Sequence, residues 1–276
     1  MTGASSFLHR GHRLAYTVHG EGERTCVLLH GLLLSQRMHL HLAAALAERG
    51  HRVVTLDLLG HGLSDRPGGM ANSSMPLFAG QVVGLLDHLG IERAVIGGTS
   101  LGANVTIEVA AQAPSRVEGM LIEMPVLDHA LPAGAAVFTP IMLALTLGRP
   151  AMTMVSYATR MVPGAFVPFW IDVALDMVRQ DPAPSGAVIQ GILFDRVAPP
   201  GSVRRTLEAP ALIIGHHRDP IHLFSDADML AAELPNARLL EASTLLEMRL
   251  APARLTAEVC AFLAAIPHNG DQGNSR

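Results

Sequence analysis

A serine between two glycines is the strongest candidate for chemistry in this 276-residue chain. Ser100 lies in the run Gly-Thr-Ser-Leu-Gly, directly after the apolar residues 93–97 and directly before an alanine-rich helical pattern. Small residues on both sides permit a sharp turn from strand to helix, which lifts the hydroxyl out of the backbone. The N–H group of Leu101, at the start of the helix, can donate to a developing oxyanion. The pattern therefore predicts a nucleophilic serine.

Two glycine-containing loops earlier in the chain are candidates to complete such a site. Residues 28–32 read Leu-Leu-His-Gly-Leu and end an apolar strand-like run. Gly31 allows close approach to a ligand, and the N–H of Leu32 would be a second oxyanion donor. We interpret His30 chiefly as structural, although it stays among the candidate substrate contacts. Residues 57–65, Asp-Leu-Leu-Gly-His-Gly-Leu-Ser-Asp, form a turn whose polar side chains are expected to tie loops together.

The elements that must position these loops alternate along the chain. Short apolar runs predict strands over residues 25–29, 51–56, 93–97, 117–122, 211–215 and 237–240. Helical patterns stand between them, over residues 37–48, 76–89, 101–113, 226–233 and 252–265. Solidly apolar strands joined by helices are typical of a parallel sheet that is covered on both faces. We expect an α/β fold with one antiparallel edge strand added by residues 12–18.

The alternation stops between Pro125 and Ala209, where the chain becomes rich in Met, Phe and Pro. We expect a helical cap over residues 125–209, inserted into a core of residues 1–124 and 210–267, and a disordered tail over 268–276. So apolar a segment must pack against something. Its large side chains are expected to bury one another or to close an apolar pocket; they are Phe138, Met142, Met152, Met154, Met161, Phe166, Phe169, Trp170 and Met177.

Composition excludes several kinds of chemistry. The chain is 49% hydrophobic and 16% charged, with a net charge of −4, and all 20 basic residues are arginine. Without lysine there is no Schiff-base chemistry, no pyridoxal phosphate anchor and no P-loop lysine. The arginines are scattered, so we expect no nucleic-acid partner. No motif indicates a nucleotide, haem or metal, and we expect no cofactor.

The sequence also predicts a cytoplasmic protein. No apolar run follows the basic residues at the N-terminus, as a secretory signal would require. Cys26 and Cys260 are expected to be unpaired, as is usual in a reducing compartment. The longest apolar stretch, residues 133–148, contains Pro140 and is too short to span a membrane.

In their order and spacing, the His-Gly loop, the turn at 57–65, the serine turn and a late acidic residue resemble the α/β-hydrolase superfamily over nearly the whole chain. The resemblance implies an α/β-hydrolase fold with a cap, and Ser100 as the nucleophile. It implies an oxyanion hole made by Leu32 and Leu101. It further implies that Asp219, after a late strand, is the catalytic acid.

One part of the family pattern is missing from this sequence. Members of the superfamily carry the catalytic histidine after the last strand, yet residues 241–250 contain none. Leu245 or Leu246 stands at the expected position. A leucine cannot accept the serine proton, and a hydroxyl is a poor nucleophile without an adjacent base.

Other histidines are candidates to replace it. His217 and His222 flank Asp219, and Asp128 with His129 follows the strand at 117–122, all in loops at the sheet edge that carries Ser100. We expect a histidine only three residues from its acid, as His222 is, to have difficulty bridging that acid to the serine. The spacing matches no zinc site. The candidate catalytic set is Ser100, Asp219 and His222, and the candidate substrate contacts are His30, Thr99, Asp128, His129, Phe169 and Trp170.

Three functions are consistent with these residues. The missing histidine favours a non-hydrolytic enzyme that binds a hydrophobic carbonyl compound and catalyses proton transfer, cyclisation or carbon–carbon bond formation. Resemblance to superfamily members that diverged in this way in polyketide-type secondary metabolism permits that hypothesis. The alternatives are a serine ester hydrolase with a relocated histidine and a catalytically silent binding protein. The expected partner is a hydrophobic small molecule, and a homodimer is left open.

Overall fold

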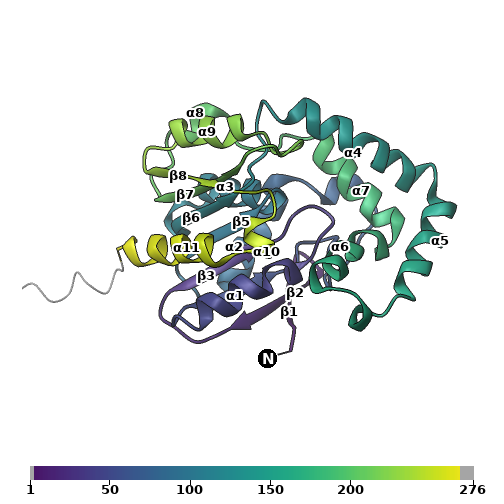
Figure 1. The fold of residues 1–276 in the computed structure, drawn as a ribbon, viewed down its shortest axis with the longest axis horizontal. Helices are drawn as coiled ribbons and strands as arrows, with labels where there is room; N and C mark the ends of the chain where they lie inside the picture. Colours follow the sequence, from purple (N-terminus) through teal and green to yellow (C-terminus); the bar gives the residue numbers. More distant parts are fainter. Residues whose placement is uncertain (1–2, 268–276) are drawn as a thin grey trace, which may run out of the picture.

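The computed structural model describes residues 3–267, so the tail expected to be disordered, 268–276, lies outside the described residues. A twisted sheet of order β1-β2-β4-β3-β5-β6-β7-β8 runs through the centre of the molecule (Figure 1). Its strands are β1 Ser5–His9, β2 His12–His19, β3 Thr25–Leu29, β4 Arg52–Leu56, β5 Ala94–Thr99, β6 Val117–Glu123, β7 Ala211–His216 and β8 Ala237–Ala242. Strands β3 to β8 are parallel, which confirms the predicted α/β fold.

The antiparallel end of the sheet differs from the prediction in one respect. Residues 12–18 do form an antiparallel strand, β2, but it is not the edge, because β1 pairs on its outer side. Arg10 and Gly11, both with positive φ, make the two-residue turn between β1 and β2. Such a turn matches the twist of a hairpin. The short polar run that precedes it gave no hydrophobic signal for a strand.

Helices cover both faces of the sheet and create two cores. Alternate residues of β3 point to opposite sides, so Val27 and Leu29 pack with α2 and α3, while Cys26 and Leu28 pack with α1 and α11. Both cysteines are unpaired. The helices of this part are α1 Leu40–Ala47, α2 Met75–His88, α3 Leu101–Gln112, α9 Phe224–Glu233, α10 Glu247–Leu250 and α11 Ala253–Ala265. Short 3-10 turns are η1 Gln36–His39, η2 Met70–Asn72 and η3 Pro114–Arg116.

The cap segment, residues 125–209, is helical. Its elements are α4 Leu131–Thr146, α5 Arg149–Arg160, η4 Gly164–Phe166, α6 Phe169–Arg179, α7 Pro182–Leu193 and α8 Gly201–Arg204. Its helices α4 to α7 stand to one side of the sheet, whereas α8 lies beside α9 on the core (Figure 1). Within residues 3–267 no single helix has the length and apolar character to cross a membrane. Helices α4 and α5 have that length and apolar character only when they are taken together, and they are bent by 94° where they meet.

Candidate active site

Ser100 occupies a strained turn between β5 and α3. Its backbone has φ 55° and ψ −113°, a conformation that L residues rarely adopt. A side chain on Gly98 would clash with the backbone of Gly102, and one on Gly102 would clash with the carbonyl of Leu29. The glycines are therefore required by the close approach of strand and helix. The predicted strand–turn–helix around the serine is confirmed.

His222 bridges Ser100 and Asp219. Its Nε2 lies 2.8 Å from the Ser100 Oγ, and its Nδ1 lies 2.7 Å from Oδ2 of Asp219. The expectation that a histidine three residues from its acid would have difficulty bridging that acid to the serine is therefore wrong. The physical reason is a tight turn. Oδ1 of Asp219 accepts the backbone N–H groups of Ile221 and His222, at 2.8 and 3.0 Å, so the chain folds around the carboxylate.

The charges of this turn suit proton transfer. Burial would raise the pKa of Asp219, but the hydrogen bond and charge of His222 outweigh it and hold that pKa below its ordinary value. An ionised Asp219 accepts the Nδ1 proton and leaves Nε2 free to accept the proton of the serine hydroxyl. The arrangement has the geometry of a nucleophile, a general base and an orienting acid.

The two predicted oxyanion donors are the backbone amides of Leu32 and Leu101, residues that line the cavity at Ser100. Leu101 is the first residue of α3, so its N–H is among those without an acceptor inside the helix. Leu32 lines the same cavity as Ser100 and Leu101. The loop around Leu32 is held by a bond from the Gly31 N–H to the Met38 sulfur and by the Gln180 amide of the cap segment, which donates to the Leu33 carbonyl.

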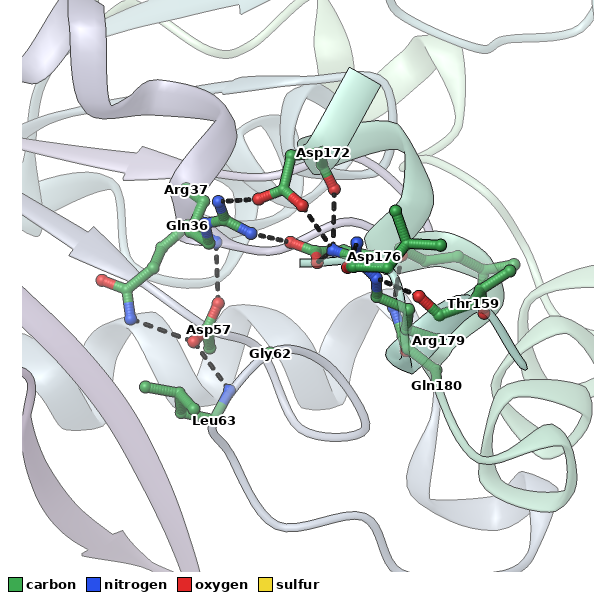
Figure 2. Close-up of polar contacts among 12 residues, drawn as sticks. Gln36, Arg37, Asp57, Gly62, Leu63, Thr159, Asp172, Asp176, Arg179 and Gln180 are labelled. Atoms are coloured by element: carbon green, nitrogen blue, oxygen red, sulfur yellow. Dashed lines mark hydrogen bonds and ion pairs between the residues drawn. The ribbon is translucent and has the colours of Figure 1, made fainter. Parts of the chain in front are cut away.

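Asp57 fixes the end of this loop, where η1 begins. Its carboxylate accepts the backbone N–H of Gln36 at 2.7 Å, the Gln36 side-chain amide at 2.9 Å and the N–H of Leu63 at 2.9 Å (Figure 2). Ser64 in turn donates to the Asp57 carbonyl. The prediction that the polar residues of the turn at 57–65 tie loops together is confirmed.

Arg37, next to that loop, links the core to the cap segment. Its guanidinium lies 2.6 Å from Asp172 and 2.7 Å from Asp176 on α6, and Arg179 pairs with the same two carboxylates (Figure 2). Because the pairs are partly shielded from water, they hold α6 against η1. The position of the cap segment is thus coupled to the loop that presents Leu32.

An apolar cavity opens at the serine. It contains about 580 Å³ of empty space, including its open mouth. The cap segment supplies one wall through α4 and α7, and the core supplies the other. The lining residues are Leu32, Met75, Ser100, Leu101, Asn104, Val126, Leu131, Gly134, Ala135, Phe138, Ile189, Ile192, Leu193, Val197 and Ile221.

None of the six predicted substrate contacts is among the residues that line this cavity. His30 is fully buried and its Nε2 accepts the N–H of Leu58, and Thr99 is buried against Glu123. Asp128 faces solvent beside Arg204, and His129 lies beside Asp226. Phe169 and Trp170 pack with His41 on the outside of the core. The sequence could not show that Phe169 and Trp170 lie outside the pocket, because the cap segment has no regular alternation of polar and apolar residues.

Among the other candidate histidines, His217 also lies apart from the serine. It is exposed, stacks on Phe224 with ring centroids 4.0 Å apart, and lies 3.2 Å from Glu241. Among residues 3–267 no group of three or more His, Cys, Asp or Glu side chains is arranged to hold a metal.

A largely buried ion pair is formed by a residue shortly after the position where the family histidine was expected. Leu245 and Leu246 lie partly exposed in the loop after β8. In α10, the next element, the Arg249 guanidinium lies 2.6 Å from Glu123, at the end of β6, and also donates to Thr99, the residue before the nucleophile. Burial would raise the pKa of Glu123, but Arg249, His216 and Thr99 hold it well below its usual range. Sequence analysis missed this cluster because its members are far apart in the chain.

Buried neutral histidines near the site predict acid sensitivity. Burial and the charge of Arg249 lower the pKa of His39 from 6.5 to about 4. Between pH 6.5 and pH 4, His39 is protonated in the unfolded chain but not in the folded chain. The free energy of unfolding therefore falls as the pH is lowered from 6.5 toward 4. One such histidine changes the free energy of unfolding by up to about 1.4 kcal/mol per pH unit.

Urea unfolding at several pH values tests this expectation. In His39→Gln, whose amide can still donate to the Leu29 carbonyl, the slope between pH 7 and pH 5 should be smaller by an amount of about that size. His217→Gln, at an exposed position, is the matched control and should keep the parent slope. Equal slopes in all three proteins would contradict the assignment of His39 as neutral.

Curated proteins of known sequence match part of this chain. A protein called a non-heme haloperoxidase, from Mycobacterium phage D29, is 34% identical over 113 residues, which are 41% of this chain and 39% of that protein. The 2-hydroxy-6-oxononadienedioate/2-hydroxy-6-oxononatrienedioate hydrolase 2 of Pseudomonas putida is 38% identical over 120 residues, which are 41% and 40% of the two chains. The match therefore spans about two fifths of each curated relative.

The likeness of the fold extends further than the likeness of sequence. The crystal structure of an enol-lactonase from Burkholderia xenovorans LB400 superposes with a TM-score of 0.75 over 94% of this chain and 100% of that one, at 23% identity. A family model described as the alpha/beta hydrolase fold matches residues 25–168. With the strand order, the serine turn and this match together, the chain belongs to the α/β-hydrolase fold family.

Proposed function

We propose that the chain is a serine hydrolase that cleaves esters of hydrophobic compounds. The observation that carries the proposal is the bridge made by His222 between Ser100 and Asp219, at 2.8 and 2.7 Å. His222 takes the proton of Ser100 as the hydroxyl attacks the ester carbonyl, and returns it to the leaving alcohol. The N–H groups of Leu32 and Leu101 stabilise the oxyanion, and water then releases the acid from the acyl-serine.

The argument for a non-hydrolytic enzyme no longer applies. That hypothesis was favoured because the serine had no base, and His222 is in hydrogen-bonding distance of the serine. The same distance argues against a silent binding protein, since an unused serine needs neither a histidine nor a carboxylate aligned behind it. The relocated-histidine alternative is the one that this geometry supports.

The cavity indicates the substrate class. Its walls are almost entirely aliphatic, and the polar groups near the reacting atoms are those of the Ser100 region and Asn104. The Asn104 side chain is already used, since it bonds to the backbone of Val126 and Val197. The walls therefore offer apolar contact and no charged group for a polar substituent, which favours an ester that carries an alkyl or aryl group.

A fluorophosphonate probe tests the proposal directly, because it reacts with serines that have a working base. We expect the purified chain to be labelled at Ser100, as read by mass spectrometry of the digested protein. Ser100→Ala should not be labelled, and His217→Ala should be labelled at the parent rate. Absence of labelling in the folded parent chain would refute a serine hydrolase.

A further inference from the structure

The large side chains of the cap segment contribute little to the cavity at Ser100. Of those that were expected to bury one another or to close an apolar pocket, only Phe138 is among the lining residues. Met154, Met161 and Phe166 are instead 74%, 71% and 83% exposed. The wall that the cap segment supplies is therefore formed mainly by other residues.

One face of α4 forms part of that wall. The residues of α4 that line the cavity are Leu131, Gly134, Ala135 and Phe138. Because they are three or four positions apart, they lie on the same side of the helix. The two smallest, Gly134 and Ala135, stand between the larger Leu131 and Phe138. The face therefore carries its least side-chain volume at its centre.

Gly134 differs from the other glycines that the structure describes. It is buried, yet a Cβ atom added to it would meet no atom within 4 Å. Because Gly134 lines the cavity, the space that a side chain would occupy there is space in the cavity. The other glycines with as much free space are all exposed, namely Gly3, Gly11, Gly50, Gly68, Gly69 and Gly90.

Neither packing nor backbone geometry requires a glycine at this position. In other helices the glycines have close neighbours, since a Cβ atom on Gly84, Gly102 or Gly191 would lie 2.3, 2.1 or 2.2 Å from another atom. Gly134 has no such neighbour, and its φ is not in the positive range that favours glycine. A glycine within a helix lowers the stability of the helix relative to alanine. The physical effect that remains is the space that Gly134 leaves in the cavity wall.

The start of α4 is tied to the core. Asp226, fully buried on α9, accepts three backbone N–H groups of residues 127–130, at 2.6, 3.0 and 3.0 Å. The Asn104 side chain bonds to both backbone groups of Val126, at 2.7 and 3.0 Å. These bonds hold the first turn of α4 in place, so a side chain added at position 134 should fill the cavity rather than displace the helix.

We propose that Gly134 determines the substrate specificity of the cavity, by making it wide enough for an ester that carries a branched or cyclic apolar group. An unbranched chain needs no extra width at one point of the wall, whereas a ring or a branched carbon does. The inference rests on the proposed ester hydrolysis. It concerns which ester fits, and it leaves the roles of Ser100, His222 and Asp219 unchanged.

Pairs of esters with equal numbers of carbon atoms test the proposal. One pair is p-nitrophenyl heptanoate and p-nitrophenyl cyclohexanecarboxylate, and the other is hexyl acetate and cyclohexyl acetate, so that the ring lies on either side of the ester bond. In at least one pair, the parent should turn over both members with kcat/KM values within about tenfold of each other. Gly134→Ala should lower kcat/KM for the cyclic member of that pair by about tenfold or more relative to the linear member, and Gly134→Val should lower it further.

Two control variants separate the effect on the cavity from the effect on the helix. Ala136 lies on α4 but is exposed and does not line the cavity, so Ala136→Val should keep the parent ratio of kcat/KM values. Gly80 lies on α2, where a Cβ atom would meet only the His9 ring, at 3.9 Å. Gly134→Ala and Gly80→Ala should both raise Tm by about 1–3 °C, because alanine favours the helix, but only Gly134→Ala should change the ratio.

Labelling with a fluorophosphonate that carries a small ethyl group distinguishes a failure of this inference from a failure of the proposed hydrolase. Ser100 should be labelled in the parent and in every variant, because the reacting residues are intact in all of them. The inference is overturned if the labelled parent and the Gly134 variants show the same ratio for both pairs of esters. It is also overturned if Ala136→Val changes the ratio as much as Gly134→Val. A folded parent that is not labelled would refute the hydrolase itself, and this inference with it.

Discussion

His222→Ala is expected to reduce kcat for hydrolysis of a p-nitrophenyl ester by about 10³-fold or more, with the protein still folded. The imidazole is the group within hydrogen-bonding distance of the Ser100 hydroxyl, at 2.8 Å, so its removal leaves the nucleophile without a base. Steady-state kinetics on hexanoate esters measures the effect. KM should change little, because His222 is not among the side chains that line the cavity.

The combined effect of two substitutions on kcat distinguishes a catalytic triad, whose members act as a unit, from residues that act independently. Ser100→Ala/His222→Ala should be no slower than the slower single variant, because each single change already stops the acyl-serine cycle. His217→Ala and His129→Ala serve as controls and should keep parent kinetics, since both side chains lie apart from the serine. If His222→Ala retained more than about a tenth of the parent kcat, the assigned base would be incorrect.

Arg249→Met is expected to lower the free energy of unfolding by about 3–5 kcal/mol. The substitution leaves the Glu123 carboxylate buried without its positive partner, which lies 2.6 Å away in the parent. It also removes the contact of the guanidinium with the Trp170 ring, 5.8 Å from its centroid. Urea denaturation monitored by circular dichroism measures the change.

Two comparisons identify the cause of that loss. Arg238→Met breaks an ion pair with Glu258 in which the arginine is half exposed, and it should cost less than about 1 kcal/mol. Glu123→Gln/Arg249→Met should recover part of the stability lost in Arg249→Met, because the second change removes the buried charge. A double variant that is less stable than Arg249→Met would show that lost packing, not the orphaned carboxylate, is responsible.

Much of the fold could be predicted from local patterns. The apolar runs at 25–29 and 211–215 became β3 and β7 with ends that agree within one residue, because buried parallel strands require unbroken apolar side chains. Strand β1 escaped prediction since only Phe7 of its five residues is buried. For an edge strand with one buried side chain, hydrophobicity carries almost no signal.

The candidate site was predictable only in part. The serine turn depends on residues that are adjacent in sequence, so its two glycines were enough to predict it. The reach of His222 depends on the backbone path through Arg218, which has φ 63°, and on the turn around the Asp219 carboxylate. Sequence spacing alone does not reveal such a path. The exposure of Phe166 was likewise hidden, because periodicity shows that a segment is apolar but not which of its sides meets water.

The turn from Asp219 to His222 has a consequence for how the protein tolerates motion. With acid and base separated by two residues, positional error between them does not accumulate through a strand, a loop and a helix. Residues 224–267 contain none of the three residues of the proposed triad. Loosening of the last helix should therefore reduce resistance to heat well before it disturbs turnover, and the two properties can be tuned independently in this chain.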